Sequence, residues 1–327
     1  MSSAESPFHE WIQLEQPRLG TIVTFATDEF FAAKERLIQP SEPVFIDDKY
    51  DDHGKWMDGW ESRRRRTPGY DHCVIRLGVP GVVRGFDIDT RHFTGNYPPQ
   101  ASIDACSSEA DVPENGWAEL LAKTTLQGNA HHYVEVDSEQ VWTHLRLNIY
   151  PDGGVARLRV FGQVRPDLAG IDGVIDLVAL KNGGRAIACS DEHFGSMHNL
   201  NVIGRGVNMG DGWETARRRG PGNDWVILAL GHTGIVERIE VDTAHFKGNF
   251  PDRVSVEAAM FDRDADVVAD SDRWQTLLPE SKLAMDQIHF FERELQPFGP
   301  VSHVRMSIYP DGGISRLRLY GQVASKE

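Results

Sequence analysis

The stretch IYPDGGVARLRVFGQV, from Ile149 to Val164, decides the fold expected for this chain. Pro-Asp-Gly-Gly is a strong turn signal, with residue types that tight turns favour. After it, charged and apolar residues alternate with the period of two that marks a β-strand, and the preceding HLRLNIY alternates in the same way. The stretch therefore predicts a β-hairpin. Nearly the same letters, IYPDGGISRLRLYGQV, return from Ile308 to Val323.

Other unusual phrases also occur twice, and in the same order. DGWESRRRR begins at Asp58 and DGWETARRR at Asp211, while DTRHFTGNYPP begins at Asp89 and DTAHFKGNFPD at Asp242. The 327-residue chain is therefore an internal duplication. Each copy has about 140 residues, which is too long for a stacking repeat and enough for a complete domain with its own core.

We expect the first repeat at residues 1–168, a linker at 169–184 and the second repeat at 185–327. The linker is rich in proline, glycine and aspartate, and its apolar half is expected to pack between the domains. Frequent turns between short strands indicate an all-β antiparallel sandwich for each repeat. Helical turns are expected only at 117–123, at 274–278 and within DEFFAAKERL, residues 28–37.

The composition excludes several classes of function. A net charge of −15 disfavours nucleic acid and anionic membranes as partners, although a local arginine cluster could still bind a small anion. No apolar run is long enough to span a membrane and no signal peptide is recognised, so we expect a cytoplasmic protein. Three cysteines without a CxxC pair predict free thiols. No glycine-rich phosphate loop is found, so no nucleotide cofactor is expected, and we expect no organic cofactor of another kind.

The duplicated phrases, with HHYVE at 131–135 and IHFFE at 288–292, resemble the allantoicase family over nearly the whole chain. The resemblance implies two tandem jelly-roll β-sandwich domains of the galactose-binding-domain type. It also implies a homo-oligomeric hydrolase that converts allantoate to (S)-ureidoglycolate and urea in allantoin and purine degradation. A divalent metal is compatible with the resemblance, but the metal ligands are unknown, because HHYVE lacks the spacing of a zinc site.

Allantoate carries one carboxylate and two ureido groups on a single carbon, so its site needs a cation, hydrogen-bond acceptors, an acid and a base. The loop that begins at Asp89 supplies such a set. Asp89 and His92 are the expected catalytic pair, with the carboxylate orienting the imidazole, and Arg91 is expected to bind the substrate carboxylate. His245 is the catalytic candidate of the second copy. The alternative is structural, since both copies could use the phrase to form the same corner.

The DGWE phrase provides further candidates. Glu61 is expected to be catalytic, and Arg64 and its counterpart Arg217 are expected to bind substrate. His132 of HHYVE is a further substrate-binding candidate. The alternative for the arginines is a solvated surface or ion pairs with nearby acids.

One difference between the copies bears on where the site lies. Arg91 of the first copy is Ala244 in the second, which favours a site in one copy or a single composite site; the alternative is a random surface substitution. The enzyme hypothesis competes with a non-catalytic relative that binds a small ligand or carbohydrate, because jelly rolls often bind polar ligands on their loop rim without reaction. Conversion of allantoate to urea by the purified protein would separate the two.

Overall fold

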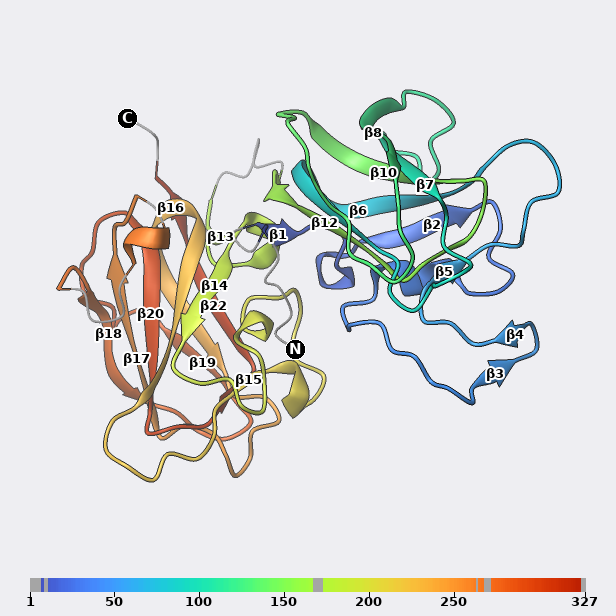
Figure 1. Cartoon of the computed structure of the whole chain (residues 1–327). Helices are drawn as coiled ribbons and strands as arrows, with labels where there is room; N and C mark the ends of the chain where they lie inside the picture. Colours follow the sequence, from blue (N-terminus) through green and yellow to red (C-terminus); the bar gives the residue numbers. More distant parts are fainter. Residues whose placement is uncertain (1–6, 9–10, 167–172, 263, 268–271, 325–327) are drawn as a thin grey trace. The chain divides into compact units, whose positions relative to one another are not determined.

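The computed structural model describes residues 7–8, 11–166, 173–262, 264–267 and 272–324. It contains two compact units, Met1–Pro166 and Asp167–Glu327 (Figure 1). The described residues form β-strands and short 3₁₀ helices, with no α-helix among them. The predicted all-β class, with two tandem jelly-roll sandwiches from a duplication, is confirmed.

In the first unit, one long strand links the two layers of the sandwich. This strand, β6 (Asp71–Asp89), pairs through its first half with β2 and β10 and through its second half mainly with β12 and β9, always antiparallel. Strands β7 and β8 extend one side of the sheet beyond β10, and β1 extends the other side beyond β12. Besides β6, the strands in the described part of this sheet are β1 (Ile12–Gln13), β2 (Ile22–Ala26), β7 (Gln100–Cys106), β8 (Ala118–Thr125), β9 (Tyr133–Glu135), β10 (Val141–Tyr150) and β12 (Arg157–Val164).

The second unit repeats this arrangement around β16 (Asp224–Asp242), as the warmer half of Figure 1 shows. Each strand of its main sheet has a counterpart in the first unit. The other strands in its described part are β13 (Ile175–Asp176), β14 (Arg185–Cys189), β17 (Arg253–Ala259), β18 (Gln275–Lys282), β19 (Ile288–Phe291), β20 (Val301–Tyr309) and β22 (Arg316–Val323).

Small two-stranded sheets and 3₁₀ turns complete both units. One pair, β5 (Trp60–Glu61) with β11 (Gly154–Val155), has the counterpart β15 (Trp213–Glu214) with β21 (Gly313–Ile314). A third pair, β3 (Tyr50–Asp51) with β4 (Gly54–Lys55), forms a protruding hairpin in the first unit (Figure 1). The 3₁₀ turns are η1 (Pro17–Leu19), η2 (Lys34–Ile38), η3 (Leu180–Asn182), η4 (Met197–Asn199), η5 (Met209–Asp211) and η6 (Asp264–Asp266).

The predicted hairpin around Pro-Asp-Gly-Gly is wrong. Strands β10 and β12 do not pair with each other, because each pairs with a different end of β6: Ile149 lies opposite Asp71, and Arg157 lies opposite Asp89. The loop between them therefore carries the chain from one layer to the other. Its glycines serve close packing, since a Cβ on Gly154 would lie 2.0 Å from the ring of Phe93.

Two of the three expected helical segments are also strands. Residues 118–125 form β8 and residues 275–282 form β18, each paired with one neighbour at a sheet edge. Most of their side chains face solvent, so the apolar alternation of a half-buried strand is weak there. The helical turn expected within residues 28–37 is confirmed by η2 (Lys34–Ile38).

Each unit has its own apolar core. Trp60 and Trp213 are fully buried at equivalent positions, and each donates its indole N–H to a backbone carbonyl, of Asp28 and Asp191, both at 2.8 Å. Burying an apolar side chain of this kind contributes about 1.5–3 kcal/mol. The DGWE phrase thus recurs partly because its tryptophan occupies an equivalent core position in both units.

The segment expected as a linker is partly folded. Residues 167–172 lie outside the described residues, but Ile175–Asp176 pair with β22, and Val178 is buried in the core of the second unit. Val178, from the apolar half of the segment, therefore belongs to the core of the second unit. No helix in the described part of the chain is long and apolar enough to cross a membrane.

Candidate active site

Three of the repeated phrases meet at one corner of each unit. In the first unit, Glu61 of DGWE lies opposite Gly154 of PDGG, and the Asp152 carboxylate accepts the backbone N–H of Arg65 at 2.8 Å. Gly154 in turn packs on Phe93. In the second unit Asp311 accepts the N–H of Arg218 at 2.7 Å in the same way. Much of the duplicated sequence therefore maintains a corner that both units need.

Asp89 is buried in this corner and does not orient His92. The side chain is 2% exposed and lies 2.7 Å from Nη2 of Arg91, which also pairs with Glu42. The Arg91 backbone N–H donates to the same carboxylate at 2.8 Å. The expected Asp89–His92 pair is absent: Arg91 occupies the carboxylate, and Nε2 of His92 faces the carbonyl of Pro43.

The second unit neutralises its equivalent carboxylate, Asp242, with an arginine from another segment. Arg205 Nε lies 2.9 Å from Asp242, while Ala244, at the position of Arg91, is 1% exposed. Arg205 occupies the position of Glu42, since the residues before them, Gly204 and Ser41, accept equivalent bonds from Arg316 and Arg157. The contrast between Arg91 and Ala244 is therefore a compensated exchange, and it does not by itself mark one unit as active.

His92 and His245 share one local geometry. Both have a positive φ, of 70° and 72°, and each Nε2 faces a backbone carbonyl, that of Pro43 at 3.1 Å and that of Gly206 at 2.8 Å. Because a carbonyl can only accept, Nε2 carries the proton in both residues and Nδ1 of the neutral ring keeps its lone pair. The two imidazoles are thus alike in tautomer and differ only in what surrounds them.

The surroundings differ because the first unit has an insertion. The N–H of Val44 reaches the carboxylate of Asp58, 14 residues away in sequence. The equivalent bond from Val207 to Asp211 spans only 4 residues. The difference, 14 − 4 = 10 residues, includes the β3–β4 hairpin, for which the second unit has no equivalent among its described residues.

The inserted hairpin and the corner enclose an open pocket of about 380 Å³. It brings Glu61 and His92 together with Lys55 and Asn96, so two of the sequence-predicted catalytic residues share one cavity. The lining residues are Phe31, Phe45, His53, Gly54, Lys55, Met57, Glu61, His92, Thr94 and Asn96.

Glu61 is the strongest acid candidate in this pocket. Burial raises the pKa of its carboxyl, although Asn96, which donates from Nδ2 to Oε1 at 2.7 Å, opposes the shift. The same pair recurs between Asn249 and Glu214 in the second unit. Burial therefore favours the protonated form that a general acid requires.

The remaining predicted substrate-binding residues do not line the pocket. Arg64 and Arg217 are exposed, in keeping with the solvated alternative. His132 has both ring nitrogens bonded to backbone, Nδ1 to the carbonyl of Ile88 at 2.7 Å and Nε2 to the N–H of Gln127 at 2.8 Å. Its imidazole holds a loop together and has no free nitrogen for a ligand.

An imidazole–carboxylate pair that the sequence did not reveal lies nearby on the same unit. His131 Nδ1 is 2.7 Å from the Asp87 carboxylate, and the imidazole stacks on Tyr133 with ring planes 5° apart. Burial raises the pKa of Asp87, while His131 opposes that shift. The sequence signal for this pair is weak: Asp87 and Asp89 are two residues apart on one strand, so their side chains face the same side.

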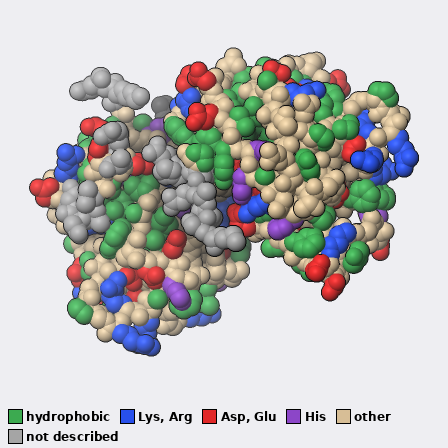
Figure 2. Space-filling view, viewed as in Figure 1, with side chains coloured by type: hydrophobic (Ala, Val, Ile, Leu, Met, Phe, Trp, Pro, Cys, Tyr) green, Lys and Arg blue, Asp and Glu red, His purple; other side chains and the backbone are tan. Residues whose placement is uncertain are grey.

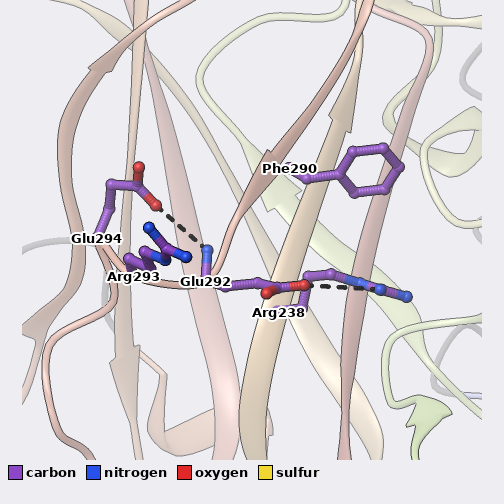
Figure 3. Close-up of a pocket in the computed structure, with 5 residues that line it drawn as sticks. All are labelled: Arg238, Phe290, Glu292, Arg293 and Glu294. Atoms are coloured by element: carbon purple, nitrogen blue, oxygen red, sulfur yellow. Dashed lines mark hydrogen bonds and ion pairs between the residues drawn. The ribbon is translucent and has the colours of Figure 1, made fainter.

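A pocket of similar volume, about 380 Å³, in the second unit lacks such chemistry (Figure 3). Arg238 on β16 lies over the ring of Phe290 and pairs with Glu292 at 3.6 Å. Arg238 is thus paired with a carboxylate, and a second arginine, Arg293, also lines the pocket, but none of the described lining residues is a histidine. Figure 2 shows acidic and basic side chains interspersed over the visible face, without a continuous basic area among the described residues.

No group of three or more His, Cys, Asp or Glu side chains is arranged to hold a metal ion in the described part of the chain. The prediction that the cysteines are unpaired agrees with the structure, because Cys73, Cys106 and Cys189 are all free. Burial raises the pKa of each of these thiols, which disfavours the reactive thiolate.

Comparison with known proteins gives a consistent result over the whole length. A family model described as the allantoicase repeat matches residues 12–165 and 175–324. A probable allantoicase of Ralstonia nicotianae is 58% identical over 314 residues, 94% of either chain. Another, of Pseudomonas syringae pv. syringae, is 54% identical over 325 residues, 98% of either chain. The crystal structure of allantoicase from Saccharomyces cerevisiae matches with a TM-score of 0.80 at 37% identity, covering 96% of this chain and 93% of that one.

Proposed function

Because the chain belongs to the allantoicase family, we propose that it hydrolyses allantoate to (S)-ureidoglycolate and urea in the pocket of its first unit. The proposed activity rests on sequence similarity to two probable allantoicases, which extends over nearly the full length of this chain and of each relative. The location rests on one observation: Glu61 and His92 line the same pocket, and the hairpin that helps to enclose it has no counterpart in the described part of the second unit.

In this reaction, the bond between the central carbon and one ureido nitrogen breaks, and a bond from that carbon to a water oxygen forms. His92 acts as the general base, because Nδ1 is the nitrogen left without a proton when Nε2 donates to Pro43. It takes a proton from the attacking water. Glu61, with its raised pKa, gives a proton to the departing urea nitrogen. Proton exchange with solvent then restores both groups, so that allantoate and water yield ureidoglycolate and urea.

Asn96 positions the acid. It holds one oxygen of Glu61 by its amide N–H and thereby leaves the other oxygen for the substrate. We propose that no organic cofactor takes part, and we assign no metal ligand. The enzyme is proposed to act in the cytoplasm as a homo-oligomer. The three free thiols support a reducing compartment.

The duplication provides matched controls for a test of this site. Urea release from allantoate is measured for the wild type, for His92→Ala and Glu61→Gln, and for the twin variants His245→Ala and Glu214→Gln. The twins lose the same backbone or asparagine contacts outside the pocket. The first pair should lose activity by about 10²–10⁴-fold, the usual contribution of an acid or base, while the twins retain it. Equal losses of activity in both pairs of variants would show that the active site is not in this pocket.

A further inference from the structure

The first unit needs a cation for the substrate carboxylate, and the arginines expected for this role are elsewhere. Arg91 is engaged by two carboxylates, those of Asp89 and Glu42. Arg64 is exposed and does not line the pocket. With a net charge of −15, the protein as a whole repels an anion, so a positive group close to the reacting carbon is required.

Among the described residues that line the pocket, Lys55 is the only lysine or arginine. Its Nζ donates to the carbonyl of Ile46 at 3.1 Å and lies 4.7 Å from the ring centre of Phe45 and 5.0 Å from that of Tyr50. These contacts limit the conformations of a long side chain before any ligand arrives. An ammonium group has three N–H donors, and the carbonyl takes one of them, which leaves donors for a carboxylate.

The hairpin that carries Lys55 is itself held in shape. Asp51 accepts the backbone N–H of His53 at 3.0 Å, and Gly54 adopts φ of +127°, which favours glycine. At the base of the insertion, Arg36 donates to the carbonyl of Met57 at 2.7 Å. The ammonium group is therefore positioned by an ordered turn, in the unit that also holds Glu61 and His92 in a pocket.

From this arrangement we infer that Lys55 binds the carboxylate of allantoate and that the inserted hairpin makes the first unit specific for a ureido acid. The inference rests on the proposed function. The carboxylate is present in the ground state and in the transition state alike, so Lys55 contributes uniform binding. Its loss should therefore raise KM and leave kcat largely unchanged.

The test compares allantoate with methylenediurea, which has the same two ureido groups but no carboxylate. KM for allantoate and the inhibition constant of methylenediurea are measured for the wild type, Lys55→Met, Lys55→Arg and Lys49→Met. Lys49 is the matched control, because it lies on the same insertion over the ring of Trp56 and does not line the pocket. Lys55→Gln, which keeps a donor without the charge, serves as a second variant in case Lys55→Met unfolds.

Lys55→Met should raise KM for allantoate about tenfold to a hundredfold, the range expected for a charge-assisted hydrogen bond, without weakening inhibition by methylenediurea. Lys55→Arg should recover most of the loss, and Lys49→Met should resemble the wild type. An unchanged KM in Lys55→Met, or an equal loss for both compounds, would overturn the role of Lys55 while the wild type still released urea. A wild type that released no urea from allantoate would instead reject the proposed function itself.

Discussion

Two substitutions can give Asp89 in the first unit the arginine partner that Asp242 has in the second unit. Arg91→Ala removes the guanidinium that lies 2.7–3.1 Å from the two carboxylate oxygens of Asp89. Adding Glu42→Arg supplies a new guanidinium from the position that Arg205 occupies beside Asp242. We expect the single change to destabilise the first unit and the double change to restore most of its stability.

The magnitude follows from the burial of the two partners. Removing one member of a buried ion pair costs about 3–5 kcal/mol. Asp89 is 2% exposed, but Arg91 is 28% exposed, and its backbone N–H still donates to the carboxylate after the change. A loss of about 2–4 kcal/mol is therefore expected, which corresponds to a fall of about 5–15 °C in the melting temperature of a domain of this size. Glu42→Arg alone should change stability by less than about 1 kcal/mol, because an exposed ion pair contributes little.

Unfolding of the full chain is measured by calorimetry and by titration with guanidinium chloride. Urea is not used as the denaturant, because it is a product of the reaction. Arg64→Ala is the control, because this exposed side chain should contribute no more than about 0.5 kcal/mol. Urea release is measured on the same samples and should return with stability in the double variant. A single variant as stable as the wild type, or a double variant no more stable than the single one, would refute the account. A stable but inactive double variant would show that Arg91 contacts substrate.

Two further predictions concern folding. Burial raises the pKa of Glu15 to about 7, so the folded state binds this proton more tightly than the unfolded state. Its contribution to stability is then full below about pH 4.5 and is lost as the pH rises to about 7, by up to about 3 kcal/mol, and Glu15→Gln should remove this slope from the unfolding free energy measured against pH. Gly154→Ala should destabilise the first unit by about 1–3 kcal/mol, because the added methyl group would meet Phe93 at 2.0 Å. Gly95→Ala, where a Cβ would meet nothing within 4 Å, should be nearly neutral in the same melting experiment.

The fold class could be predicted because alternation and duplication are properties of the sequence itself. The pairing of strands could not. Pro-Asp-Gly-Gly is a local turn signal, and such a signal does not reveal that Ile149 and Arg157 lie against opposite ends of one 19-residue strand. Likewise, residues 118–125 form an edge strand with much exposed surface, so their pattern lacks the periodicity that separates a strand from a helix.

Two of the residues named from the sequence, Glu61 and His92, line the candidate pocket. The sequence marks both residues through their repeated phrases, but only the packing at the corner shows that the two phrases meet. Lys55 lies outside every repeated phrase, and the sequence offered no partner with which to compare it. The Asp87–His131 pair depends on the register between β6 and β9, which the sequence does not specify.

A duplicated chain therefore needs a stricter criterion for function than a difference between its copies. Arg91 and Ala244 differ, yet Arg205 supplies a guanidinium to the equivalent carboxylate, so the buried aspartate is paired with an arginine in both copies. Residues shared by both copies are ambiguous as well, because His92 and His245 have the same backbone angle and the same bond to a carbonyl. Lys55 meets the stricter test, since the described part of the second unit has no hairpin and hence no equivalent cation. A difference that the other copy does not compensate is the one that selection for folding alone does not explain.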